Sequence, residues 1–209
     1  MNPSTESPGS DGPRLGRPRD GALTDRVLSG AQDVVIEQGP DRLSADALAA
    51  VTGVSRAAIY RRWPDTAALL AEIVTRCRPV PAIPDTGSLR GDLVGLLEPW
   101  TRALDRDERL VATVLGRARH SPALRAGLEA AVVHPLDAAV ATAVDRHVAR
   151  GHEVPAAGRV LLGRLLLALW WERYVSEPAA TTDTVVAEMV DRALLPVSPR
   201  GPGSDTLPG

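Results

Sequence analysis

The sequence predicts an all-α protein of about nine helices, in which a small three-helix N-terminal domain precedes a larger helical domain. Apolar residues recur at the helical spacing of three and four positions along most of the chain. Hydrophobic residues make up 44% of the chain, but aromatic residues only 3%, and Phe is absent. The core must therefore consist of Leu, Val and Ala, which long helices accept better than β-sandwiches do.

Both ends of the chain have the composition of tails. Residues 1–21 and 196–209 are rich in Pro, Gly, Ser and Asp, which predicts disorder. Between them, we expect one domain at 22–66 and a second at 67–195. The first tail also carries a small basic cluster, formed by Arg14, Arg17 and Arg19.

The first helix is predicted at 22–38, where the apolar residues fall on one side. Gly39 and Pro40 end it, because glycine favours the position after a helix and proline cannot continue one. The residues on its apolar side are Leu23, Val27, Leu28, Ala31, Val34 and Val35.

The second helix begins after Ser44, whose hydroxyl suits an N-cap, and runs to about Val51. Asp46 lies in its first turn, where the helix dipole favours a negative charge. A turn centred on Gly53 follows. Ser55 is the next N-cap, and it starts a third helix at 56–62.

Further helices follow from similar signals. Pro64 ends the third helix, and Asp65 or Thr66 caps a fourth that runs to about Arg78. Residues 79–87 contain three prolines and one glycine, which indicates a linker. The remaining helices are predicted at 88–105 with a kink at Pro99, at 107–119, at 122–150 with a kink near Pro135, at 155–176 and at 181–195.

The segment 44–63 has the residue types of a helix-turn-helix. Ala49 is small where the second helix would cross the first, and Gly53 suits a turn position with positive φ. Leu48, Val54 and Ile59 are apolar at the positions that must face inward.

With those three residues inside, the outer face of the third helix carries Arg56, Ala57, Tyr60 and Arg61. Arginine contacts guanine edges or phosphates, tyrosine donates to phosphate, and alanine permits close approach to a thymine methyl. The serine caps and the basic tail can add phosphate or minor-groove contacts. The predicted DNA-binding residues are Arg14, Arg17, Arg19, Ser44, Ser55, Arg56, Ala57, Tyr60, Arg61 and Arg62.

A helical interaction or carrier protein, whose helix-turn-helix only packs, is the alternative. In that case Arg61 and Arg62 form a solvated surface, and Tyr60 joins Trp63 in the core. The net charge of -2 gives this alternative slight support, but it does not exclude nucleic acid, because charge distribution matters more than the sum.

Residues 22–74 resemble the N-terminal domain of TetR/AcrR transcriptional regulators, and the sequence GRPR at 16–19 is typical of that family. The most specific part is the run from Gly53 to Pro64. The family pattern continues with Ser-Lys-Glu, whose lysine reaches a phosphate. The matching positions here are Asp65, Thr66 and Ala67, so the resemblance leaves the Thr66 hydroxyl as the candidate contact.

This resemblance implies a nine-helix, all-α homodimer. Our first hypothesis is a repressor that binds a palindromic operator in double-stranded DNA as a dimer and responds to a small-molecule effector. The resemblance also implies that helices one to three bind DNA, that helix four connects, that helices five to seven enclose the ligand, and that helices eight and nine dimerise. No ligand contact is carried over, because the C-terminal half matches only in general plan.

The predicted helix at 155–176 is apolar nearly all round, so it is either a central core helix or part of a symmetric dimer, and we favour the dimer. Arg164 within it must meet water, an acid or an anionic ligand, and an interface salt bridge is the plainest of these. Trp100, Trp170 and Trp171 are candidate ligand contacts, with core packing as the alternative for each.

Several other classes of protein lack support in the sequence. No catalytic constellation is present, so we expect no enzyme and no cofactor. The four histidines show no metal-binding spacing, and Cys77 alone cannot form an internal disulfide, although it could act as a redox switch. No stretch approaches the roughly 18 apolar residues of a membrane helix, and no signal peptide is visible, so we expect a cytoplasmic protein.

Overall fold

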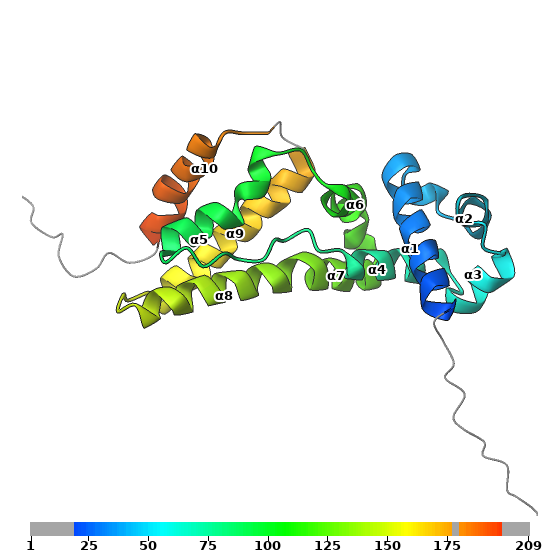
Figure 1. Ribbon diagram of the computed structural model, residues 1–209, viewed down its shortest axis with the longest axis horizontal. Helices are drawn as coiled ribbons and strands as arrows, with labels where there is room; N and C mark the ends of the chain where they lie inside the picture. Colours follow the sequence, from blue (N-terminus) through cyan, green and yellow to red (C-terminus); the bar gives the residue numbers. More distant parts are fainter. Residues whose placement is uncertain (1–18, 177–179, 198–209) are drawn as a thin grey trace, which may run out of the picture.

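The computed structural model describes residues 19–176 and 180–197, and every regular element in these ranges is a helix. The predicted all-α fold is therefore confirmed. Figure 1 shows α1, α2 and α3 grouped at one end of the molecule and α5 to α10 at the other, with α4 between them. The α-helices are α1 Arg19–Gln38, α2 Ala45–Thr52, α3 Arg56–Arg62, α4 Thr66–Arg76, α5 Leu89–Leu96, α6 Arg106–Val114, α7 Pro122–Leu128, α8 His134–Ala149, α9 Ala156–Ser176 and α10 Asp183–Met189.

The first four helices lie where the local signals predict them. α1 begins at Arg19, three residues before the predicted start, so it includes the end of the predicted tail. It ends before Gly39, whose φ of 87° is one that glycine adopts without strain. Residues 1–18 and 198–209, most of the two predicted tails, lie outside the described residues.

The core of the N-terminal domain is formed by apolar residues of α1, α2 and α3 together with Trp63, which is 5% exposed. The Trp63 indole Nε1 donates to Glu72 Oε2 of α4 at 2.6 Å. α1 and α2 approach each other closely at Gly30, where a Cβ would lie 2.5 Å from the Thr52 methyl carbon. A side chain at Gly30 would therefore push α2 away from α1.

The helix predicted at 88–105 is wrong in its second half. α5 ends at Leu96, a 3-10 turn covers Glu98–Thr101, and extended backbone follows. Pro99 lacks the N–H that would bond to Gly95, so the α-helix cannot pass through it. The chain re-enters a helix at Asp105, whose carboxylate and that of Glu108 form a reciprocal capping box at the start of α6.

The helix predicted at 122–150 is confirmed as one continuous run: α7, a π turn at Glu129–Val133 and α8. The π turn lies just before Pro135, where proline disturbs the α-helical hydrogen bonds. This run is long and apolar enough to cross a membrane by length and composition, contrary to our expectation. It packs against α4, α5 and α9, and half of its most apolar window is buried, as in a core helix.

The predicted eighth and ninth helices correspond to α9 and to α10 with its following π turn, Val190–Leu194. α9 packs against α8 on one side and against α6 and residues 190–197 on others. Its buried face includes Leu162, Leu166, Trp170, Arg173 and Tyr174. The larger domain is thus built around one face of α9.

Candidate nucleic-acid interface

The turn between α2 and α3 has the geometry that the sequence predicts. Ser44 Oγ accepts from Ala47 N at 3.1 Å, and Ser55 Oγ accepts from Ala58 N at 3.3 Å. Gly53 closes α2 with a φ of 69°, and its N–H donates to Ala49 O. Both serines are the N-caps of their helices, so their hydroxyl oxygens already accept hydrogen bonds from backbone N–H groups of the first turns.

The inward and outward faces of α3 also agree with the prediction. Ile59 is 2% exposed and packs with Leu48 and Val54 in the core. Tyr60 is 57% exposed, and the three other residues predicted for the outer face are exposed as well: Arg56, Ala57 and Arg61. These four side chains form one outer face of α3, called here the α3 face. α3 lies at the end of the molecule away from α8, α9 and α10, as Figure 1 shows.

Arg56 has a partner that the sequence analysis missed. Its guanidinium NH1 lies 2.5 Å from Asp46 Oδ1 at the start of α2, and both side chains are well exposed. Exposed ion pairs contribute little to stability, so a DNA phosphate can compete for this guanidinium. The signal was present in the sequence, because both residues stand in the first turns of neighbouring helices.

The remaining arginine of α3 lies differently. Arg62 is half-buried, whereas Arg61 is exposed, so Arg62 does not belong to the α3 face. Trp63 is a core residue, whereas Tyr60, for which a core role was also open, is exposed. Arg14 and Arg17 lie outside the described residues, and Arg19 is the first residue of α1.

Thr66 is the first residue of α4 and is exposed. The N-cap of this helix is Asp65, whose Oδ1 accepts from Ala68 N at 2.6 Å. The Asp65 carboxylate occupies an N–H group at the start of α4 that could otherwise bind a phosphate. Its negative charge also repels a phosphate. This end of α4 is therefore a poorer phosphate site than the serine-capped start of α3.

The first turn of α6 joins the N-terminal domain to the larger one. The Arg106 guanidinium donates to Asp33 Oδ1 at 2.7 Å and to Ser29 O at 2.8 Å, both on α1. Asp107 accepts from Gln32 Nε2 of α1 and from Arg78 N just after α4, each at 2.8 Å. α6 therefore holds the position of α1 relative to the larger domain.

Cys77 lies at this junction and is 3% exposed. Its Sγ donates to Ile73 O at 3.2 Å. Burial, with the nearby Asp107 carboxylate, raises the pKa of the thiol well above its usual range. The thiol therefore stays protonated, which favours a packing role over the redox role that the sequence left open.

Inside the larger domain, Glu108, the residue after Asp107, forms a buried ion pair with Arg173. Glu108 Oε1 lies 3.1 Å from Arg173 Nε, and both side chains are at most 1% exposed. Arg102 NH1 also donates to Glu108 Oε2 at 2.6 Å. The Arg173 guanidinium lies 5.2 Å from the centre of the Trp100 ring, within range of a cation–π contact.

The structure brings two of the three candidate ligand-contacting tryptophans together. The Trp100 and Trp170 rings are 4.9 Å apart at their centroids and nearly perpendicular, and both are buried. Trp171 is half-buried and meets this group only through the Tyr174 ring, 6.1 Å away. We call Trp100, Trp170, Arg173, Tyr174 and Glu108 the aromatic–ionic cluster.

Two polar atoms of the aromatic–ionic cluster have no hydrogen-bond partner among the described residues: Trp170 Nε1 and Tyr174 Oη. Burial raises the pKa of the Tyr174 phenol well above its usual range, so it stays a hydrogen-bond donor. Both groups therefore offer an N–H or O–H to an acceptor that the described residues do not supply.

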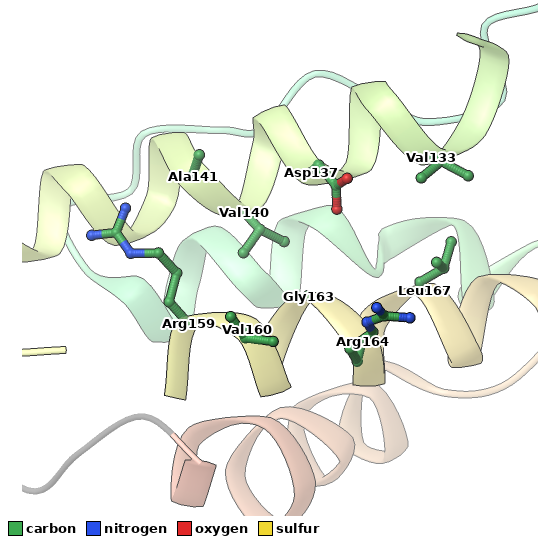
Figure 2. Close-up of a pocket in the computed structure, with 9 residues that line it drawn as sticks. All are labelled: Val133, Asp137, Val140, Ala141, Arg159, Val160, Gly163, Arg164 and Leu167. Atoms are coloured by element: carbon green, nitrogen blue, oxygen red, sulfur yellow. The ribbon is translucent and has the colours of Figure 1, made fainter. Parts of the chain in front are cut away.

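A surface groove of about 410 Å³ runs between α8 and α9. Figure 2 shows Asp137 projecting from α8 toward α9, and Arg159 and Arg164 projecting from α9. The apolar residues that line the groove include Val140, Val160 and Leu167. Neither Asp137 nor Arg164 forms an ion pair or hydrogen bond with another described residue.

Sequence models of one family match both domains. The model described as "Bacterial regulatory proteins, tetR family" matches residues 27–73, and "Tetracyclin repressor-like, C-terminal domain" matches residues 83–193. The second match alone spans more than half of the chain.

Relatives point to the same family. A helix-turn-helix-type transcriptional regulator of Mycobacterium tuberculosis is 36% identical over 169 residues, which cover 80% of this chain and 83% of that protein. A DNA-binding transcriptional repressor of Mycobacteroides abscessus named TetR is 33% identical over 129 residues, covering 57% of this chain and 67% of the repressor. These proteins are regulators rather than enzymes, which agrees with our expectation.

Solved structures share the fold. Salmonella enterica GusR superposes with a TM-score of 0.68 at 18% identity, over 88% of this chain and 98% of GusR. NalD of Pseudomonas aeruginosa, the secondary repressor of a multidrug efflux pump, superposes with a TM-score of 0.61 at 21% identity, over 88% of this chain and all of NalD. From the matched models, the relatives and the exposed α3 face, this chain belongs to the TetR family of helix-turn-helix transcriptional regulators.

Proposed function

We propose that this regulator is a repressor that binds a palindromic operator as a homodimer and releases it when a small molecule binds the larger domain. The observation that carries the DNA-binding part is the α3 face, where Tyr60 and two arginines are exposed on a helix whose opposite side is core. This is the arrangement that a major-groove helix requires. The relative from Mycobacteroides abscessus, named as a repressor, supports the sign of regulation. We place its action in the cytoplasm, where the operator lies.

The homodimer part is supported by the outer face of α9. Val160, Leu161 and Val175 are 63%, 46% and 73% exposed, although all three are apolar. Exposed apolar side chains of this kind on one side of a helix favour burial against a second copy. Two-fold pairing would place two α3 helices about 34 Å apart, which is one turn of B-DNA.

The effector part is supported by the aromatic–ionic cluster. An effector with a planar apolar body and hydrogen-bond acceptors would match its aromatic rings and the two unpartnered donors of Trp170 and Tyr174. We retain Trp100 and Trp170 as effector contacts. Trp171 remains a proposed effector contact at the edge of the aromatic–ionic cluster. Its half-buried ring also suits a place in the dimer interface.

The first turn of α6 would transmit effector binding to the DNA-binding domain. Glu108 belongs to the aromatic–ionic cluster, while its neighbours Arg106 and Asp107 hold α1. A ligand that displaces Glu108 would therefore move the residues that position α1 and, through it, α3. Such coupling requires the ligand to prefer one of the two arrangements.

Replacing Arg61 or Tyr60 with alanine is expected to weaken operator binding by about 10-fold or more, since each variant loses a phosphate or base contact of roughly 1–3 kcal/mol. Fluorescence anisotropy measures this on a genomic duplex that the wild-type protein retards in a gel. The control is Arg192→Ala, which removes an exposed arginine far from α3. Unchanged affinity of both α3 variants across salt concentrations would contradict the DNA-binding part and favour the carrier alternative.

Replacing Tyr174 with phenylalanine is expected to leave the stability of the ligand-free protein unchanged or to raise it by up to about 1 kcal/mol. The hydroxyl is buried without a partner, so its removal relieves a desolvation cost. Urea unfolding of wild type and variant measures the difference. A loss of more than about 1 kcal/mol would mean that the hydroxyl already has a partner, and it would remove Tyr174 from the effector site.

A further inference from the structure

The face of α9 that points away from its own core has a regular composition. Its exposed residues are Val160, Leu161, Arg164, Ala168, Glu172 and Val175, and the half-buried Leu165 and Trp171 flank them. On a helix of about 3.6 residues per turn, these positions lie opposite the buried face of Leu162, Leu166 and Trp170. We call this set the α9 seam.

The α9 seam carries two charges of opposite sign, and both lack an ionic partner among the described residues. Arg164 forms no ion pair or hydrogen bond there, and Glu172 accepts only from Ser176 Oγ, one turn further along α9. Asp137 of α8 lines the same groove as Arg164, and Figure 2 shows both, but no ion pair joins them. An arginine covered by an apolar surface requires a counter-charge.

The α9 seam is symmetric about Ala168. Arg164 and Glu172 lie four residues to either side of it, and all the apolar residues except Val160, whose mirror position is Ser176, follow the same rule. Leu165 and Trp171 lie three residues to either side, and Leu161 and Val175 lie seven. In a two-fold contact, residue i of one copy meets residue j of the other and j meets i. A sequence symmetric about one position therefore matches itself when two copies pair in opposite directions.

We propose that two copies pair α9 against α9 with the two-fold axis beside Ala168, so that Arg164 of each copy binds Glu172 of the partner subunit. The small side chain of Ala168 permits close approach at the crossing point. Each charge lies about 6 Å along the helix from that point, and long arginine and glutamate side chains bridge such an offset at an inclined crossing. This pairing rests on the homodimer of the proposed function. The two contacts between Arg164 and the partner's Glu172 fix the register, that is, how the two α9 helices align along each other.

Charge reversal tests this register. Arg164→Glu places two acids on each α9 seam, and Glu172→Arg places two arginines there, so each variant alone opposes like charges across the axis twice. We expect each to weaken the dimer on the order of 100-fold, measured by sedimentation equilibrium of the full chain without DNA. The double variant, and an equimolar mixture of the two single variants, restore opposite charges at both contacts and should regain dimers.

Two controls accompany the measurement. Asp137→Asn removes the other acid that lines the groove and should leave the dissociation constant within about threefold of wild type. Recovery in the mixture shows that the single variants are folded, because a misfolded chain could not regain the contact.

The outcomes separate the register from the proposed function. If wild type is a dimer and both single variants keep its dissociation constant, the register is overturned while the dimer stands. If the single variants dissociate but neither the mixture nor the double variant recovers, the pairing of Arg164 with the partner's Glu172 is overturned. A monomeric wild type overturns both the register and the dimer of the proposed function.

Discussion

Replacing Glu108 with alanine is expected to lower the free energy of unfolding by about 3–5 kcal/mol, because it leaves the buried Arg173 without its counter-charge. Glu108 also accepts from Asp105 N at 2.8 Å in the capping box, so the start of α6 loses a cap as well. For a chain of this size, the melting temperature should fall by about 10 °C. Urea unfolding and calorimetry measure both quantities.

The matched control is Glu188→Ala, which breaks an exposed pair with Arg192 of the π turn after α10 and should change stability little. A second variant separates charge from packing. Glu108→Leu combined with Arg173→Met removes both buried charges and should be more stable than Glu108→Ala, since no uncompensated charge remains. If Glu108→Ala is as stable as Glu188→Ala, the buried pair does not hold α6 as described.

Replacing Ala57 with glutamate is expected to reduce operator affinity at least about 100-fold. Ala57 lies on the α3 face between Arg56 and Tyr60, and a carboxylate there meets base edges and phosphates with a like charge. Fluorescence anisotropy at fixed salt measures the change. The fold should be unaffected, because the side chain is exposed.

The control for Ala57→Glu is Ala138→Glu, which makes the same change of side chain and charge at an exposed position of α8. Both variants shift the net charge equally, so a general loss of affinity for a polyanion would affect them alike. If Ala57→Glu binds as well as Ala138→Glu, α3 does not contact the operator.

Local signals predicted the N-terminal domain well, because its caps and turns depend on neighbouring residues. Ser44, Gly53 and Ser55 act within one turn of their own helices. The predicted helix at 88–105 failed because apolar spacing alone cannot tell whether Pro99 bends a helix or ends it. The extended stretch after it is held partly by Arg173, which bonds to Arg102 O from 71 positions along the chain.

In the candidate sites too, features set by neighbouring residues were predictable, and features set by residues far apart in the sequence were not. The α3 face follows from helical spacing once the inward residues are known, so it was predictable. The Glu108–Arg173 pair joins residues 65 positions apart, and no local pattern announces that both are buried. The sequence did predict that Arg164 needs a partner, but only the exposure of the surrounding α9 seam indicates where that partner lies.

Footprinting of genomic DNA with the purified wild-type protein tests the central claim, that this chain binds an operator through α3 as a dimer. We expect protected segments with two inverted half-sites whose centres lie about 10 base pairs apart or a multiple of one helical turn. We also expect that Ala57→Glu protein leaves these segments open. No protected segment, or equal protection by wild type and Ala57→Glu, would contradict operator binding through α3.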